Sequence, residues 1–509
     1  MDPKRKNDSV SASTSNDPKK WKKEVCPHAE KCYRRNPHHF KEYDHPHLSN
    51  IMKQGSDFIL PNGFPQERNV IIEQINILKS LARPEKEMQV CSSKQPIPKS
   101  TMNGRSNSSR PSNQQKKLHP TIYFLHLLCP SLGELKTSLQ FNFMIDVMWL
   151  MEQYRACGLG KIPLTILYGY EFPDMETYMS RFLPNITYHR VKMKDPFGTH
   201  HSKDWNHYNQ GLWISPACGR LPEGSTKNDG ESSTKFKSTL IQYLQSYNVT
   251  CLKEWIERVE MADFSSIKVF LVTSVPGKHY PQKDGSHVHR VTDILSKHCV
   301  LPSKTTTQSE GPLAWGINAQ ASTLGSLGKT PAEWLRSVML RTLATHKQGQ
   351  PTGNSHATLN IVYPTVDNVM TSLFGAEGGG CLPYAKNIHE KQKWLKDYLH
   401  QWKADVTCRT RVMPHIKTYC RISPCLTKLA WFLLTSANIS KAAWGGNIQK
   451  DAAVYVRSYE VGVMFMPNLF DEDYFFIDRS SVAEGRYCFP FIYDFPLTPY
   501  TQTDYPWCN

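Results

Sequence analysis

The sequence lacks any long apolar run. Its most apolar stretch, Leu429–Leu434, is far shorter than the roughly 18 residues that a helix needs to cross a bilayer. The charged start, Met1–Lys6, has no apolar segment behind it, so nothing there resembles a secretory signal. We therefore expect neither a membrane-spanning nor a secreted protein.

Cysteine and acidic residues are also scarce. Fourteen cysteines in 509 residues are too dilute for a disulfide scaffold, and most stand alone in apolar surroundings, as Cys129 and Cys299 do. We interpret them as reduced thiols, which are typical of cytosolic or nuclear proteins. The 61 Lys and Arg residues outnumber the 45 Asp and Glu residues by 16, which favours a polyanionic partner such as nucleic acid.

The N-terminal quarter differs in texture from the rest. Residues 1–25 are predicted to be a basic disordered tail, whose lysine clusters either bind an import receptor or are merely solvated. Residues 26–47 form a dense Cys/His segment. Residues 48–118 are predicted to be a linker with one short amphipathic helix, indicated by the helical spacing of Ile71, Ile75, Leu78 and Ala82.

From residue 119 onward, apolar runs alternate with helical patterns. Such alternation favours an α/β layered domain with a largely buried sheet. The runs are Ile122–Leu128, Leu164–Tyr168, Val269–Val275, Leu359–Tyr363, Leu429–Thr435 and Val461–Met466. The helical patterns are Phe141–Tyr154, Phe236–Tyr247 and Glu390–Trp402. Two polar segments are predicted to be surface loops, Pro216–Ser233 and Thr305–Pro312.

The Cys/His segment predicts a metal site. Cys26, Cys32, His39 and His45 are separated by five, six and five residues. Two thiolates and two imidazoles form a tetrahedral donor set that suits Zn²⁺, and so short a segment needs a metal to fold. We therefore predict structural zinc, against the alternative of scattered surface residues. Three further imidazoles nearby could take a ligand position: His28, His38 and His47.

The interior of this segment is more specific. The run Cys32-Tyr33-Arg34-Arg35-Asn36-Pro37, followed by His39-Phe40, resembles the PBZ finger, a zinc module that binds poly(ADP-ribose), over residues 23–47. The resemblance implies that Tyr33 and Arg34 bind this polymer, since an aromatic face and a guanidinium group suit stacked adenine and pyrophosphate. The family usually has an aromatic residue and then Gly after the first Cys, where this chain has His28 and Ala29.

Two His-x-Lys motifs carry the chemistry of the longer part. They are His201-Ser202-Lys203 and His415-Ile416-Lys417. One copy is usually incidental, but two strands that meet about a pseudo-twofold axis would bring two imidazoles and two ammonium groups together. One imidazole can then attack phosphorus while the other protonates the leaving oxygen, and the cations stabilise the phosphate charge without a metal. Gln210 and Glu460 are candidates to orient the imidazoles.

At these residues the chain resembles tyrosyl-DNA phosphodiesterases, a divergent branch of the phospholipase D superfamily. Ile422 stands where the ordinary phospholipase D signature has Asp, and Asn438, in Thr-Ser-Ala-Asn, takes over near the second Lys, as in that branch. The resemblance runs from about His119 to Asn509. Supporting matches are Gln210–Trp213, Ser326–Gly328, Leu382–Tyr384, Ala442–Gly445, Ser458–Gly462 and Pro506-Trp507.

The resemblance implies an α/β fold in which two pseudo-symmetric phospholipase D-like α-β-α sandwich halves, residues 119–265 and 266–509, form one catalytic unit. It implies that His201 is the nucleophile, oriented by Glu460, and that His415 is the general acid and then base, oriented by Gln210. The phosphate oxygens would be held by Lys203, Lys417 and Asn438. The DNA backbone would lie along Ser322, Thr323 and Ser440.

The implied substrate is single- or double-stranded DNA whose 3′ end is blocked by a phosphotyrosyl peptide from trapped topoisomerase I or by a similar group. The resemblance implies no cofactor for catalysis, a nuclear location and a monomer without membrane partners. A poly(ADP-ribose) finger and a basic chain fit this expectation, because both would place the protein at broken DNA.

One stretch of the family pattern is missing. The family continues from its first His-x-Lys through roughly two strands of chain before reaching the Asp-Trp matched here by Asp204-Trp205, whereas this chain passes directly from Lys203 to Asp204. Two alternatives to an active phosphodiesterase therefore stay open. One is an isoform that binds DNA ends and poly(ADP-ribose) without turnover, and the other is a phospholipase or endonuclease of the same superfamily.

Overall fold

The computed structural model forms two compact units, residues 1–113 and 114–509. The residues that it describes are 23–32, 40, 43–54, 58, 60, 64–65, 68–81, 124–143, 145–169, 183–193, 199, 210–281, 285–302, 314–347, 357–446, 450–477 and 488–509. The lysine clusters of the predicted tail, most of the predicted linker and the loop expected at Thr305–Pro312 lie outside these residues. No described helix is long and apolar enough to cross a membrane.

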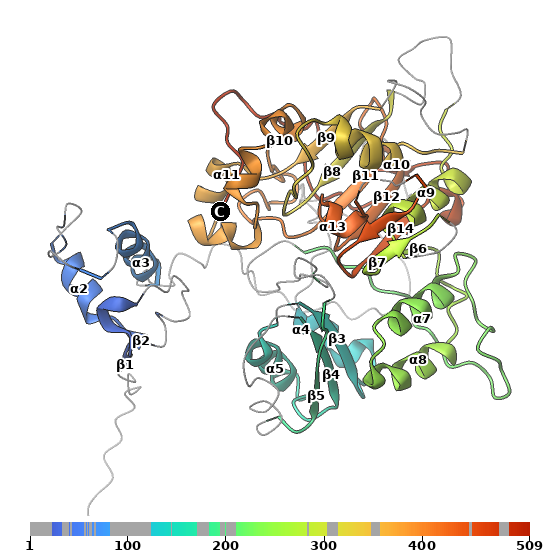
Figure 1. The fold of residues 1–509 in the computed structure, drawn as a ribbon. Coiled ribbons are helices and arrows are strands. Elements are labelled where there is room, and N and C mark those ends of the chain that lie inside the picture. Colours follow the sequence, from blue (N-terminus) through green and yellow to red (C-terminus); the bar gives the residue numbers. More distant parts are fainter. Residues whose placement is uncertain are drawn as a thin grey trace, which may run out of the picture. The chain divides into compact units, whose positions relative to one another are not determined.

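The smaller unit is built around a two-stranded parallel sheet, in which β1 (Glu24–Val25) pairs with β2 (Tyr43–Asp44) (Figure 1). Three helices complete its described part: η1 (Ala29–Lys31), α2 (Pro46–Met52) and α3 (Arg68–Leu81). Gln74 of α3 donates to the Cys32 carbonyl at 2.7 Å, so the helix predicted from the apolar spacing packs against the Cys/His segment. The apolar core of the smaller unit consists of Phe40, Leu48, Ile51, Phe58, Ile71 and Ile75.

The larger unit begins with a three-stranded parallel sheet of β3 (Ser138–Asn142), β4 (Leu164–Tyr168) and β5 (Ile186–Arg190). Helix α5 (Val147–Ala156) connects β3 to β4, because parallel neighbours need a crossover. Helices α4 (Phe124–Leu127) and η3 (Pro130–Leu132) precede the sheet. Phe124, Leu150 and Tyr154 are buried in one apolar cluster with β4.

Two sequence predictions for this sheet are wrong. The run Ile122–Leu128, expected as a strand, contains α4, because a short apolar run does not distinguish a strand from a buried helix. The helix expected from Phe141 begins only at Val147, because Phe141 and Asn142 pair with β4. Asp146 accepts a hydrogen bond from Trp149 N at 2.9 Å and thereby caps the helix.

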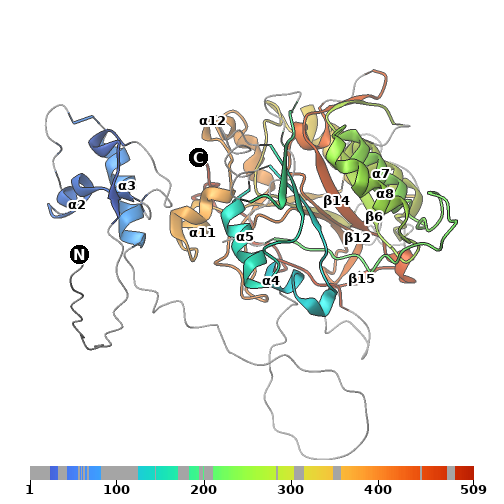
Figure 2. The ribbon, with the colours of Figure 1, turned by 90° about the horizontal axis from the view of Figure 1, so that it is seen from below.

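A helical layer follows the first sheet along the chain, and Figure 2 shows it in green beside the second sheet. It consists of α7 (Phe236–Ser246), η4 (Thr250–Leu252) and α8 (Lys253–Glu260). Leu244 and Tyr247 share a buried cluster with Leu167 of β4, and Val461 packs against this cluster, so the layer packs against both sheets of the unit. The helix predicted over Phe236–Tyr247 is confirmed by α7.

The second sheet has eight strands and contains the main core. Its order is β10-β9-β8-β11-β12-β14-β6, with β15 also paired to β12. The first three strands are parallel and the others antiparallel. Their bounds are β6 Phe270–Ser274, β8 Gly316–Gln320, β9 Leu359–Val362, β10 Leu399–His400, β11 Thr418–Ile422, β12 Lys428–Thr435, β14 Glu460–Phe465 and β15 Phe475–Phe476.

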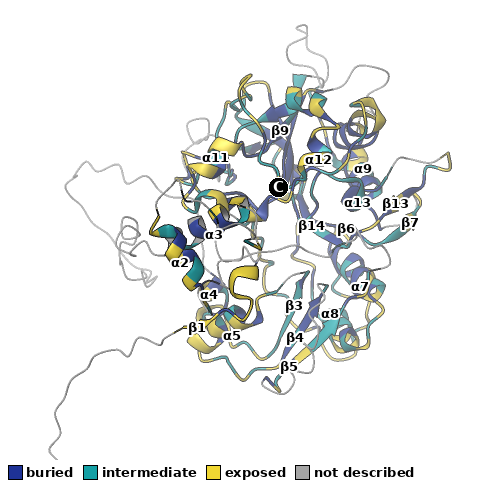
Figure 3. Ribbon diagram, turned by 60° about the vertical axis from the view of Figure 1, so that its left-hand side comes forward, coloured by how far each residue is buried: buried dark blue, intermediate teal, exposed yellow. Residues whose placement is uncertain are grey.

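The central strands of this sheet are buried almost throughout, as the dark blue of Figure 3 shows for β9 and β14. Near-continuous apolar runs therefore predicted β6, β9, β12 and β14 correctly. Beside the sheet, β7 (Gly277–His279) pairs with β13 (Val454–Val456). The surrounding helices are α9 His287–His298, η6 Ala332–Leu340, α10 Arg341–Leu343, α11 Val366–Met370, η7 Gly375–Cys381, α12 Lys386–His389, η8 Lys393–Tyr398, α13 Lys441–Trp444 and η9 Pro467–Phe470.

The helix predicted over Glu390–Trp402 is wrong. The chain instead forms η8 and then β10, whose Leu399 and His400 pair with β9. The His400 carbonyl also accepts from Tyr363 N at 2.9 Å. Pairing with an existing strand edge therefore overrides the helical spacing of the apolar residues.

Candidate active site

Five strand ends meet at one edge of the second sheet. Thr418 at the start of β11 pairs with Gln320 at the end of β8 and with Leu434 near the end of β12. Glu460 at the start of β14 pairs with Ser274 at the end of β6. Because neighbouring strands in this part are antiparallel, residues just before β11 and just after β12 and β8 lie at the same edge. These are the positions of the second His-x-Lys motif, of Asn438 and of Ser322.

His415 and Lys417 enter this edge immediately before β11. Both are buried, with 5% and 2% of their surface exposed. The Lys417 carbonyl accepts from Thr435 N at 3.1 Å, which joins the motif to the end of β12. The Lys417 ammonium group donates to the His415 carbonyl. The backbone of the motif is thus joined to β12, and the Lys417 ammonium group is held by the motif's own backbone.

Gln210 contacts the His415 ring. Its Nε2 lies 2.7 Å from Nδ1 of the imidazole. An amide can present either its nitrogen or its oxygen to a ring, so Gln210 can orient His415 both as a neutral imidazole and as an imidazolium whose Nδ1 donates to it. The imidazolium can give its Nε2 proton to a leaving oxygen, and the neutral ring that remains, with its proton on Nδ1, can take a proton back from water at Nε2.

Glu460 is buried beside Lys417, with 5% of its surface exposed. Burial raises the pKa of this carboxyl group from 4.5 to about 7, although a hydrogen bond from Ser436 and the charge of Lys417 act in the opposite direction. Ser436 Oγ donates to Glu460 Oε2 and accepts from Val461 N at 3.0 Å. The carboxyl group therefore titrates in the neutral range and is oriented by Ser436.

Asn438 is oriented by the loop that follows β8. Its Oδ1 accepts from Ser322 N at 3.0 Å, from Ser322 Oγ at 3.1 Å and from Thr323 N at 3.0 Å. These three bonds occupy the oxygen and direct the other end of the amide, Nδ2, as a donor. Ser322 is 1% exposed. Its hydroxyl group thus positions Asn438. Ser440 caps α13 by accepting from Ala443 N at 3.2 Å.

The first His-x-Lys motif, His201 and Lys203, lies outside the described residues, as do Tyr33, Arg34 and His39. The described residue nearest to it in the chain is Thr199, whose N lies 3.2 Å from Ser458 Oγ. The Thr199 carbonyl accepts from Tyr459 N at 2.8 Å. The chain that leads to His201 is thereby attached next to Glu460.

A pocket of about 260 Å³ opens at this edge of the sheet. Gln210, His415, Lys417 and Ser436 supply its polar lining, and its apolar walls include Trp213. An acid, a cation and donors of hydrogen bonds within an apolar wall suit the binding and cleavage of a phosphodiester.

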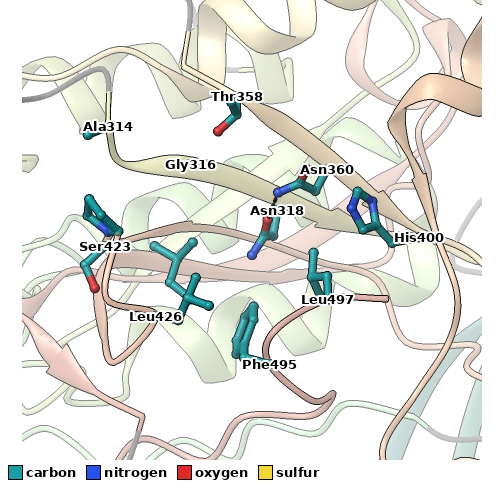
Figure 4. Close-up of a pocket in the computed structure, with 12 residues that line it drawn as sticks. Ala314, Gly316, Asn318, Thr358, Asn360, His400, Ser423, Leu426, Phe495 and Leu497 are labelled. Atoms are coloured by element: carbon teal, nitrogen blue, oxygen red, sulfur yellow. Dashed lines mark hydrogen bonds between the residues drawn. The ribbon is translucent and has the colours of Figure 1, made fainter. Parts of the chain in front are cut away.

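Figure 4 shows a second pocket, of about 250 Å³, at the other end of β8. Asn318 and Asn360 form its polar floor, joined by a hydrogen bond of 2.9 Å. Among the described residues that line it, His400 is the single titratable one and none is Lys or Arg. This pocket therefore does not offer the chemistry that a phosphate needs.

In the smaller unit, Cys26, Cys32 and His45 form a candidate metal site. Their ligand atoms all lie within 4.8 Å of one another, and all three residues are buried. Two thiol groups and one imidazole at this separation fit a zinc ion.

Sequence reasoning quoted Ser436 and Ser458 within motifs but gave them no role. It missed His287 entirely. A histidine at the start of a helix, between Ser286 and Val288, carries no signal that distinguishes a site residue from an ordinary core residue.

Comparisons with known proteins agree with this geometry. The family model described as tyrosyl-DNA phosphodiesterase matches residues 105–203 and 203–501. Tyrosyl-DNA phosphodiesterase 1 of Drosophila melanogaster is 34% identical over 587 aligned positions, which cover 94% of this chain and 98% of the relative. The chain belongs to the tyrosyl-DNA phosphodiesterase family. The predicted family and enzyme class, a phosphodiesterase of DNA repair, are thus confirmed.

Other members of the family and a second domain model extend the match. The probable tyrosyl-DNA phosphodiesterase of Caenorhabditis elegans is 30% identical and covers 72% of this chain and 80% of the relative. The crystal structure of the yeast tyrosyl-DNA phosphodiesterase matches with a TM-score of 0.52 at 18% identity, over 74% of this chain and 93% of that one, which confirms the predicted fold. The PBZ domain model matches residues 23–48, which confirms the predicted finger.

Proposed function

We propose that this tyrosyl-DNA phosphodiesterase removes 3′-phosphotyrosyl groups, such as those left by trapped topoisomerase I, and similar 3′ blocking groups from single- or double-stranded DNA. The observation that carries the proposal is the contact between Gln210 and His415 inside a buried pocket that also contains Lys417. This arrangement supports general acid catalysis next to a bound phosphate.

The reaction would proceed in two displacements. In the first, a ring nitrogen of His201 attacks phosphorus, a P–N bond forms, the P–O bond to tyrosine breaks, and Nε2 of His415 protonates the tyrosyl oxygen. In the second, His415 takes a proton from water, the hydroxide attacks phosphorus, the P–N bond breaks, and DNA with a 3′-phosphate is released. The part of His201, with Glu460 as its orienting group, rests on the family resemblance.

Charge stabilisation would come from fixed donors. Lys417, immediately before β11, and the Nδ2 of Asn438, in the loop after β12, would supply them, and Lys203 would complete the set from the first half. Ser440 and Thr323 would lie along the DNA backbone. Since fixed cations and amides serve the phosphate oxygens, the scheme requires no cofactor.

The finger would bind poly(ADP-ribose) and hold a structural zinc ion. Cys26, Cys32 and His45 already converge, and His39 would supply the fourth ligand. Tyr33 and Arg34 would contact the polymer. We propose that the protein works as a monomer in the nucleus, without membrane partners, and that the finger brings it to broken DNA.

A second candidate function is binding without turnover. The family match is interrupted at residue 203, and the Drosophila alignment runs over 587 positions, more than the 509 residues of this chain. Both observations support the proposal that a segment is missing after Lys203. Its loss could displace His201 and Lys203 while the second half still binds DNA.

A cleavage assay separates the two candidates. The whole chain, first shown to melt cooperatively, is incubated with a 3′-phosphotyrosyl oligonucleotide in EDTA. Release of a 3′-phosphate product is the result that we expect. Folded protein that binds the oligonucleotide without releasing product would favour the binding function, and cleavage only with added divalent metal would refute the two-histidine scheme.

A further inference from the structure

His287 is a buried histidine next to the candidate site. It is the first residue of α9 and has no exposed surface. Its ring lies between Ser274 at the end of β6 and Thr435 at the end of β12, and it packs edge-on against Trp444 at 5.2 Å. Both strand ends belong to the edge at which His415, Lys417 and Glu460 meet.

The hydrogen bonds around His287 fix where its proton resides. Ser274 Oγ lies 2.8 Å from the Ala443 carbonyl, which can only accept, so the hydroxyl proton points there. Ser274 Oγ must therefore accept from His287 N at 3.0 Å and from His287 Nδ1 at 2.7 Å. The neutral ring then carries its proton on Nδ1 and leaves Nε2 as an acceptor.

Nε2 determines the direction of the Thr435 hydroxyl group. The two atoms are 2.8 Å apart, so Thr435 Oγ1 donates to the ring. Its lone pairs can then accept from Ala437 N, which is 3.1 Å away. The Val461 carbonyl is a more distant acceptor, at 3.2 Å. Without the ring, Thr435 Oγ1 would lose its 2.8 Å partner, and the oxygen that accepts from Ala437 N would no longer be held in place from α9.

Thr435 lies where the polar groups of the site join. Its backbone N donates to the Lys417 carbonyl. The next residue, Ser436, orients Glu460, and the turn held through Ala437 leads to Asn438. One hydroxyl direction therefore affects the cation, the carboxyl group and the amide of the site.

We propose that His287 is a positioning residue of the active site, which acts through Thr435 to hold the turn that carries Ser436 and Asn438. This inference rests on the proposed function, because His287 itself contacts no substrate and acts only on residues of the proposed active site. Burial lowers the pKa of His287 to about 3, which agrees with a ring that stays neutral at physiological pH.

Two substitutions of His287 separate the role of Nε2 from that of Nδ1. In His287→Asn, the amide nitrogen can replace Nδ1 at Ser274, but the side chain is too short to reach Thr435. In His287→Gln, the longer side chain can place its oxygen near Thr435. We expect kcat to fall about 10- to 100-fold in His287→Asn with little change in KM, and to recover largely in His287→Gln. Thr435→Val should lower kcat as much as His287→Asn does. The double variant should lose no more kcat than either single variant.

His389→Asn is the matched control. His389 is also buried, with 4% exposed surface, but its ring contacts Tyr384 and Tyr505 and not a strand end of the site. We expect a lower melting temperature in this variant and an unchanged kcat. An equal loss of kcat in His389→Asn, or an unchanged kcat in His287→Asn, would overturn the proposal.

An NMR measurement tests the proposal independently of turnover. The ring nitrogens of His287 should show one proton, on Nδ1. In His287→Asn the carboxyl pKa of Glu460 should rise above its parent value, because Ser436 would no longer lower it, whereas Lys417, Tyr243, Tyr247 and Tyr419 stay in place. A ring proton on Nε2, or an unchanged Glu460 pKa, would refute the proposal. If these signatures appear while the parent chain cleaves nothing, the proposed function fails but the positioning role stands.

Discussion

The smaller unit, here called the finger unit, and the larger unit, here called the catalytic unit, hold their polar groups in place by different means. In the finger, Cys26, Cys32 and His45 converge within 4.8 Å, and the described apolar core around them has six buried residues. In the catalytic unit, His415 and Asn438 are oriented by hydrogen bonds at the edge of a buried sheet. We propose that the first arrangement depends on a metal and the second on packing, so polymer binding and cleavage should fail independently.

The sharpest way to test this independence is to remove the two histidines that we propose to be catalytic. We expect His201→Ala to abolish cleavage of the 3′-phosphotyrosyl oligonucleotide and His415→Ala to reduce it about 10²- to 10⁴-fold, since general acid catalysis contributes about that much. Poly(ADP-ribose) binding should not change in either variant. His126→Ala, an exposed histidine of α4, is the control. Full cleavage by His201→Ala would contradict the assignment of the first motif.

The converse change should affect the finger alone. Cys32→Ala removes one zinc ligand, and because so small a core cannot fold without the metal, we expect the loss of bound zinc and of poly(ADP-ribose) binding. Cleavage should be retained. Cys408→Ala, which changes an exposed cysteine of the catalytic unit, should leave zinc content and polymer binding intact. Unchanged polymer binding by Cys32→Ala would remove the finger from the proposal.

The two units also differ in how far sequence reasoning reached. Cys26, Cys32 and His45 are close in the sequence, so their spacing alone predicts that they bind one metal ion. In the catalytic unit, the match between Gln210 and His415 came from a family resemblance, because residues 205 positions apart give no local signal. Long buried strands such as β12 were predictable from continuous apolar runs.

The sequence-based predictions of secondary structure are wrong where pairing with a distant strand determines the local structure. Leu399 and His400 follow a helical pattern but pair with β9, and Phe141 was assigned to a helix but belongs to β3. The hydrogen bonds of Ser436 and Thr435 also depend on which strand ends meet, which the order of strands in the sheet determines and the sequence does not display.

A buried carboxyl group provides a stability test within the catalytic unit. The pKa of Glu460 is about 7 in the folded protein against 4.5 ordinarily. The folded state therefore retains a proton that the unfolded state loses, so this stabilising contribution is complete below about pH 4.5 and disappears as the pH rises through 7. At pH 8 we expect Glu460→Gln to be more stable than the parent by up to about 3 kcal/mol, although less active.

Denaturant unfolding at pH 5 and pH 8 measures this effect. The difference between Glu460→Gln and the parent should be small at pH 5 and larger at pH 8. Glu223→Gln, at an exposed position, should show no such difference. A gap that does not grow with pH would mean that Glu460 is ionised in the folded protein throughout this range.

The smallest expected effect lies in the finger. Ala29 has a φ of +42°, in the left-handed region that L residues with a side chain rarely adopt, and it stands where the family usually has Gly. Ala29→Gly would relieve this backbone strain, against the greater entropy that Gly loses on folding. We expect the free energy of unfolding of the zinc-loaded finger unit, measured in the whole chain, to rise by about 1 kcal/mol. Cleavage should stay unchanged. Ala156→Gly, in helix α5, is the comparison substitution and should bring no gain. If Ala29→Gly destabilised the finger, Ala29 would not be strained in this turn. The metal ligands would then hold the backbone of the finger unit as well as its side chains, which packing does in the catalytic unit.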